Sequence, residues 1–142
     1  MKAALYDSSV YVAALRSGDH GALSIRRMDS GSVVWLSAVV LEELYAGVND
    51  RGLPLVERLE RDFDRANRIL VPNISDWTET GRVLSRLAAR YDFEQVGRGR
   101  LTNDALIAMS AGRLGICVMT ANERDFKKLA EFRSFQWQVT AV

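Results

Sequence analysis

Four acidic residues, Asp7, Glu43, Asp104 and Asp125, each lie where an apolar segment meets the start of a helix, or just inside one. Acids that are distant in sequence but equivalently placed in successive strand and helix units can meet at one edge of a sheet. Oxygen ligands of this kind suit Mg²⁺ or Mn²⁺. We therefore predict a divalent-metal site with these four side chains as ligands.

A site of this kind is suited to phosphodiester cleavage. Carboxylates gathered in a partly dry cleft repel one another unless cations or protons compensate their charge. A bound ion can activate water, neutralise a phosphate oxygen and stabilise the departing 3′-oxygen during in-line displacement. The acids together thus predict metal-dependent hydrolysis of a nucleic acid.

Some of these acids also have a purely structural explanation. Asp104 fits a first-turn acid favoured by the helix dipole, and Asn122 with Asp125 resembles a capping box with Asp in place of Glu. Asp7 is harder to explain in this way, because a carboxylate directly after a buried strand is costly to desolvate without a cation or several donors.

Glu43 has an acidic neighbour, Glu42, that competes for the same role. Adjacent helical residues point about 100° apart, so only one of the two can face the crevice. Leu44 marks the buried stripe beside Glu43, and Gly47 follows four residues later. Geometry alone does not select between the two acids.

Short apolar segments alternate with helical patterns along the chain. The expected strands cover residues 3–6, 33–36, 69–71, 116–119 and 135–142. The expected helices begin at Ser8 or Ser9, Ser37, Pro54, Ser75, Thr102 and Asn122. This alternation predicts a three-layer α/β/α sandwich with a central, mostly parallel sheet, as one domain over residues 1–142.

The acids are expected to meet at the carboxyl ends of two strands. Asp7 follows the first strand directly, and Thr120 follows the fourth, with Asn122 and Asp125 close behind. If these two strands are neighbours, their polar ends converge at the point where the strand order reverses. In the fourth helix, the spacing places five residues on one face, Trp77, Leu84, Leu87, Ala88 and Tyr91.

Composition excludes several other classes of protein. Cys117 and His20 are the only cysteine and histidine, which excludes a zinc site with several such ligands, and Cys117 is expected to be a buried small hydrophobe. A Ser-His-Asp triad would need His20, which has no nucleophile motif nearby. The apolar stretches are too short to cross a membrane, and a cytoplasmic location is expected.

The net charge of +1 is not by itself a nucleic-acid signature. If four acids are gathered at a metal, however, the remaining surface is more basic than this total suggests. The segment 92–101 reads as a mobile loop, in which Arg98 and Arg100 are the predicted RNA contacts. Further candidate phosphate contacts, which could equally be solvated helix residues, are Arg113, Arg124, Lys127 and Lys128.

Four segments resemble the motifs of the PIN domain ribonucleases, and among them the VapC-type toxins of toxin–antitoxin pairs. The resemblance covers essentially the whole chain, and its last two motifs are the most specific. The matching segments are Leu5 to Val10, Glu43-Leu44 with Gly47, Asn103 to Ala108 followed by Gly115, and Thr120 to Phe126. Ser8 stands where threonine is frequent, which keeps the hydroxyl.

The resemblance implies a role for each matching residue and selects Glu43 over Glu42. It implies an endoribonuclease that uses Mg²⁺ or Mn²⁺ and inhibits translation. It also implies a homodimer and an antitoxin whose C-terminal segment lies in a groove and blocks the site. The implied metal-binding acids are Asp7, Glu43, Asp104 and Asp125, with Thr120 and Asn122 supporting them and Ser9 positioning the first.

Other functions on a similar sheet remain open. An aspartyl-phosphate phosphatase needs a second aspartate two residues after the first, where this chain has Ser9. A response-regulator receiver needs an acid after the third strand, where the chain has Pro72-Asn73. A PIN fold used in RNA processing, or only for RNA binding without a toxin role, is the third alternative.

Overall fold

The computed structural model describes residues 2–18, 31–91 and 101–140. Strands and helices alternate along most of this chain, as the sequence predicts. The elements are β1 (Lys2–Tyr6), α1 (Ser8–Ser17), β2 (Ser32–Ser37), α3 (Ala38–Gly47), α4 (Leu53–Arg65), β3 (Ile69–Leu70), α5 (Ile74–Tyr91), α7 (Thr102–Arg113), β4 (Cys117–Thr120), α8 (Glu123–Ala130) and β5 (Trp137–Val139).

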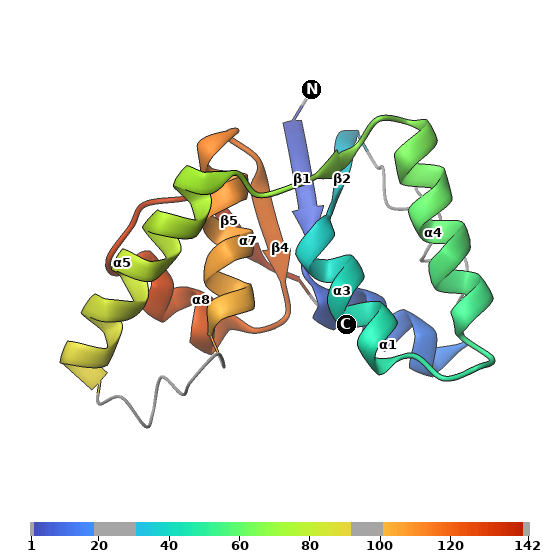
Figure 1. Ribbon diagram of the computed structural model, residues 1–142, viewed down its shortest axis with the longest axis horizontal. Coiled ribbons are helices and arrows are strands. Elements are labelled where there is room, and N and C mark those ends of the chain that lie inside the picture. The colour runs from blue at the N-terminus through green and yellow to red at the C-terminus, as the bar shows by residue number, and fades with distance from the viewer. Residues whose placement is uncertain (1, 19–30, 92–100, 141–142) are drawn as a thin grey trace.

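The strands form one five-stranded sheet in the order β3-β2-β1-β4-β5, and every pairing is parallel. β1 is central, with Leu5 opposite Trp35 of β2 on one side and Val118 of β4 on the other. Figure 1 shows α4 and α5 at opposite ends of the molecule, with the sheet between them. The predicted three-layer α/β/α fold is confirmed, and its strand order reverses between β1 and β4.

Two of the predicted helix caps are confirmed. The Ser37 hydroxyl accepts a hydrogen bond from the Val39 amide at the start of α3 (3.1 Å). Asn122 likewise accepts from the Asp125 amide at the start of α8 (3.4 Å). Ser37 is the last residue of β2, and Asn122 lies two residues after the end of β4. The two caps therefore fix where the chain leaves the sheet.

Two other predicted caps are wrong. The N-cap of α1 is Asp7 rather than Ser8 or Ser9, and Asp7 makes no side-chain cap bond. The N-cap of α7 is Leu101, so Thr102 is already inside the helix. At α1 the physical reason is visible, because the Ser9 hydroxyl donates to the Asp7 carboxylate and does not serve the helix amides.

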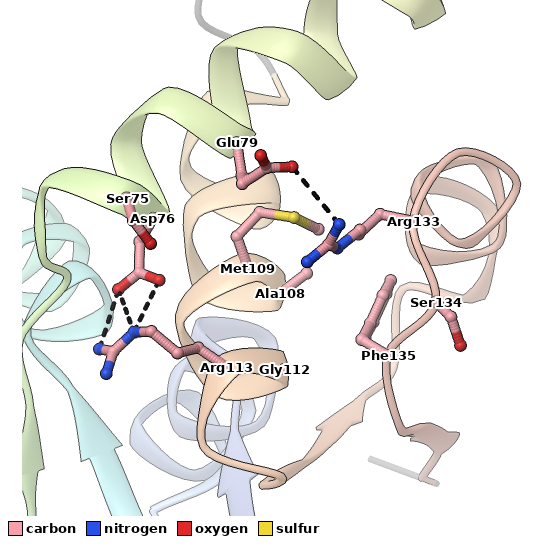
Figure 2. Close-up of a pocket in the computed structure, with 10 residues that line it drawn as sticks. All are labelled: Ser75, Asp76, Glu79, Ala108, Met109, Gly112, Arg113, Arg133, Ser134 and Phe135. Carbon is pink, nitrogen blue, oxygen red and sulfur yellow. Dashed lines mark hydrogen bonds and ion pairs between the residues drawn. The ribbon is translucent and has the colours of Figure 1, made fainter.

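One residue of the predicted face of α5 departs from the prediction, whereas Leu87 is buried and Leu84 and Tyr91 pack against the core. Trp77 is 53% exposed, whereas Asp76 is only 2% exposed. Asp76 forms a two-pronged ion pair with Arg113 of α7, with Nε–Oδ1 at 2.9 Å and Nη2–Oδ2 at 3.0 Å (Figure 2). This pair joins the start of α5 to the end of α7 and turns Trp77 outward. It also occupies Arg113, which the sequence suggested as a phosphate contact.

The core surrounds the central strands. Side chains with no exposed surface come from β1, β2 and β4 and from most of the helices: Leu5, Tyr11, Leu36, Val40, Phe63, Val83, Leu87, Ile107, Val118, Phe126 and Leu129. Cys117, predicted to be buried, is half-buried instead. None of the described helices is long and apolar enough to cross a membrane.

Candidate metal-binding active site

The candidate site lies at the carboxyl ends of β1 and β4. These two strands pair directly, with Tyr6 opposite Met119. The Asp7 amide continues the pairing by donating to the Met119 carbonyl (3.0 Å). Asp7 and Thr120 therefore leave the sheet side by side, as the sequence predicts for neighbouring strands.

Asp7 is buried, with 3% of its surface exposed, and two hydroxyl groups hold its carboxylate. Ser9 Oγ donates to Oδ1 (2.5 Å), and Thr120 Oγ1 donates to Oδ2 (2.5 Å). Burial raises the pKa of Asp7, while these hydrogen bonds act in the opposite direction by stabilising the charged form. Ser9 and Thr120 thus fix the orientation of the carboxylate.

A second set of hydrogen bonds connects Thr120 to Asp125. The Asn122 amide donates to Thr120 Oγ1 (2.9 Å), and Asn122 Nδ2 donates to Asp125 Oδ2 (2.9 Å). Asn122 therefore caps α8 and positions the Asp125 carboxylate at the same time. One continuous polar network joins Asp7 to Asp125 through residues that are distant in sequence.

Asp104 lies in the first turn of α7, and the charges of the other three acids affect its pKa. Burial, followed by the negative charges of Asp7, Glu43 and Asp125, raises the pKa of Asp104 to about 7. Burial alone raises the pKa of a carboxyl group, and nearby like charges raise it further because they disfavour a second negative charge. The fold thus brings all four predicted acids into electrostatic range of one another.

Glu43 and its neighbour Glu42 differ in environment. Burial raises the pKa of Glu43, with further contributions from Glu42 and Asp7, while Asn103 and Ser8 oppose the rise. Its Oε1 atom is buried and has no hydrogen-bond partner among the described residues. Glu42 is exposed and accepts a long hydrogen bond from Asn103 (3.4 Å).

The donor atoms at this site fit a hard divalent cation. Their positions in the described part of the chain do not form a coordination shell. Within residues 2–18, 31–91 and 101–140, no three Asp, Glu, His or Cys side chains already converge as metal ligands. The chemistry nevertheless fits, because all the donors are carboxylate oxygens and Glu43 Oε1 is buried without a partner. A cation would supply the attraction needed to draw these like charges together.

An apolar groove of about 600 Å³ lies beside Glu43, and no single motif of the sequence indicates it. Its apolar lining comes from three helices: Val12 and Leu15 of α1, Leu44 of α3 and Leu55 of α4. Glu43 lines the groove as well as facing the other acids.

A second pocket of about 380 Å³ lies between α5, α7 and the segment that follows α8 (Figure 2). Its walls carry the Asp76–Arg113 and Glu79–Arg133 ion pairs, above Met109. None of the four predicted acids lines this pocket. It therefore belongs to the junction of the helices and not to the candidate site.

Of the basic residues predicted to contact phosphates or RNA, some lie on α8 and others lie outside the described residues. Arg124 is adjacent to Asp125 on α8, and Lys127 and Lys128 follow on the same helix. Arg98 and Arg100, the predicted RNA contacts, lie outside the described residues, and so does most of the predicted loop 92–101.

The raised pKa of Asp104 predicts how stability depends on pH. The unfolded chain releases this proton near the ordinary value of 3.8, whereas the folded protein holds it to about 7. Over this interval the unfolded state binds fewer protons, so the free energy of unfolding falls as pH rises. Asp104→Asn removes this effect and is expected to stabilise the metal-free protein near neutral pH by on the order of 2 kcal/mol.

Urea unfolding in a chelator, at several pH values between about 4 and 8, measures this effect. Asp64→Asn, a substitution of an exposed acid on α4, is the matched control and should keep the wild-type profile. Identical pH profiles for wild type and Asp104→Asn would show that Asp104 is not strained by its neighbours.

Comparison with known proteins agrees with this fold. The PIN domain family matches residues 4–132. Comparison with curated proteins gives no significant match. Similar solved structures include DNA-bound VapBC from Salmonella typhimurium, with 20% identity, a TM-score of 0.67 and 98% of each chain covered.

Two further structures are similar over nearly the whole chain. VapBC2 from Rickettsia felis, bound to a DNA fragment from its promoter, is 18% identical with a TM-score of 0.67, and 96% of this chain and 98% of that chain are covered. VapBC-1 from nontypeable Haemophilus influenzae is 19% identical with a TM-score of 0.58, and 95% and 96% are covered. The family match spans most of the sequence, and the chain therefore belongs to the PIN domain family.

Proposed function

We propose that this chain is an Mg²⁺- or Mn²⁺-dependent endoribonuclease and the toxin of a toxin–antitoxin pair. The observation that carries this proposal is that Asp7 and Thr120 lie side by side at the ends of β1 and β4, with the charges of Asp7, Glu43 and Asp125 all raising the pKa of Asp104. Membership in the PIN domain family and the fold shared with VapBC structures support it.

In this proposal Asp7, Glu43, Asp104 and Asp125 hold the cation. When bound, such an ion supplies Lewis acidity, which lowers the pKa of water and neutralises charge on a phosphate. Without a cation, the acids would repel the phosphodiester of a substrate. The same four side chains thus account for both the metal requirement and the location of the reaction.

The surrounding polar side chains act as positioning residues. Ser9 and Thr120 each donate a hydrogen bond to one oxygen of Asp7, which fixes the orientation of that carboxylate. Asn122 does the same for Asp125. Residues that orient metal ligands in this way typically contribute about 10- to 100-fold to metal affinity or activity.

Replacing an acid of the cluster should abolish cleavage while the fold survives. Asp7→Asn and Asp104→Asn are expected to lower the rate of metal-dependent RNA cleavage at least about 100-fold, because each removes a charged ligand. The measurement is the cleavage rate on total cellular RNA with Mg²⁺ or Mn²⁺, beside Asp64→Asn as a control that removes an exposed acid from α4. Wild-type activity in both site variants would remove them from the catalytic role.

Mapping the cut sites in the same RNA sample tests the toxin role further. A toxin that inhibits translation should cut a small set of sites in RNA needed for protein synthesis. Cutting confined to precursor RNA ends would instead indicate an RNA-processing enzyme, and binding without cutting would indicate a non-catalytic domain.

We further propose that the groove lined by α1, α3 and α4 takes a segment of an antitoxin. The VapBC structures are described as complexes, and the apolar walls of the groove suit an amphipathic segment. Because Glu43 lines both the groove and the acid cluster, an occupant reaches the site directly. The homodimer that the family resemblance implies stays a prediction.

A charge placed in the groove should weaken antitoxin binding. Leu15→Glu is expected to lower the affinity at least about tenfold, because it buries a carboxylate against an apolar segment. Calorimetry with the co-encoded antitoxin measures this effect. The control is Val139→Glu, which places the same charge at an exposed position on β5. Equal affinities for the two variants would place the antitoxin elsewhere.

A further inference from the structure

Basic side chains lie along the C-terminal half of α5 and along α8, where Arg124 is adjacent to Asp125 of the candidate site. We name this surface the α5–α8 ridge and define it by Arg82, Arg86, Arg90, Arg124, Lys127 and Lys128. Building on the proposed ribonuclease function, we propose that the α5–α8 ridge binds the phosphates of single-stranded RNA and guides the strand to the acids.

The part of the ridge on α5 is a stripe of arginines. Arg82, Arg86 and Arg90 are spaced four residues apart, so they follow one flank of the helix at intervals of about 6 Å. Between Thr80 and Tyr91 the helix has no acidic residue to balance them. All three arginines are exposed.

This flank of α5 is the one that faces α8 and the segment after it. Glu79, which precedes Arg82 and Arg86 by three and seven residues on the same flank, lies 3.7 Å from Arg133 (Figure 2). At the end of α5, the Tyr91 hydroxyl donates to Glu131 at 2.6 Å. The arginine stripe is thus held beside the C-terminal end of α8.

The part of the ridge on α8 leads to the candidate site. Lys128 Nζ lies over the Tyr91 ring, 4.9 Å from its centre, so this side of α8 faces the end of α5. Arg124 is four residues earlier and on the same side of the helix. It is also adjacent to Asp125, so basic charge continues from the acids to α5.

The existing partners of these cations are weak enough to be exchanged for phosphates. Arg82 pairs with Glu79, and Arg90 lies 3.7 Å from Glu131, but both arginine side chains are more than 60% exposed. Exposed ion pairs of this kind contribute about 0–1 kcal/mol. Arg86 and Lys127 make no ion pair with any of the described residues.

Another helix on the molecule offers a matched comparison. α4 also has exposed arginines, Arg58, Arg61 and Arg65, but four acids are interleaved with them. The two helices thus carry the same number of arginines, but only those of α4 have acids interleaved with them. A surface that merely keeps the protein soluble would resemble α4, whereas the C-terminal half of α5 is basic only.

The salt dependence of RNA binding tests the α5–α8 ridge. The experiment measures the affinity of the full chain for an unstructured oligouridylate, in a chelator to prevent cleavage, over a series of salt concentrations. Each phosphate contact on a single strand contributes about 0.7 to the slope of log affinity against log salt. The double variant Arg86→Gln/Lys127→Gln should therefore flatten the slope by about 1.4.

The control is Arg58→Gln/Arg61→Gln, which removes the same charge from α4 and should keep the wild-type slope. Equal slopes for wild type and both variants would overturn the ridge proposal, even if wild type cleaves RNA when metal is added. A flattened slope for the ridge variant, without any metal-dependent cleavage by wild type, would instead overturn the proposed ribonuclease and the ridge's role as a substrate path.

Discussion

The parallel pairing of β1 with β4 is the constraint on which the rest of the structure depends. It places Asp7 and Thr120 side by side although 113 residues separate them. The strand order reverses at this pair, so helices leave the sheet in opposite directions and open a crevice between them. Glu43, Asp104 and Asp125 belong to three different helices, and the charges of Glu43 and Asp125 both raise the pKa of Asp104. A fold with another strand between β1 and β4 would keep every element and lose the site.

The acids of the candidate site lower the stability of the folded, metal-free protein. Asp104 and Glu43 both have raised pKa values because burial and like charges oppose their ionisation, and Glu43 Oε1 is buried without a hydrogen-bond partner. Hydrogen bonds from Asn103 and Ser8 oppose only part of the rise at Glu43, and no hydrogen bond from a described residue opposes the rise at Asp104. The other buried acid, Asp76, shows the alternative, since Arg113 pairs with it and joins α5 to α7. A cluster left without such a partner is the arrangement that a cation can stabilise.

The sequence predicted the elements and the sheet edge well, because strands with apolar runs and helices with caps such as Ser37 depend on local signals. The sequence-based predictions were wrong where tertiary contacts determine which side chain faces inward or where a helix begins. The spacing in α5 suits Trp77 as an inner residue, but the ion pair to Arg113 turns Asp76 inward instead. Thr102 looks like a cap, yet α7 already begins there. The groove and the α5–α8 ridge combine side chains from several elements, so no single segment could reveal them.

If these carboxylates form one cation site, Glu43 belongs to it and its neighbour Glu42 does not. Calorimetric titration of the protein with Mn²⁺ distinguishes the two acids, with the isosteric pair Glu43→Gln and Glu42→Gln. Glu43→Gln should weaken binding at least about tenfold, because it removes a charged ligand, whereas Glu42→Gln should stay close to wild type. Equal Mn²⁺ affinity in wild type and Glu43→Gln, or no saturable binding by wild type, would rule out a cation site that includes Glu43.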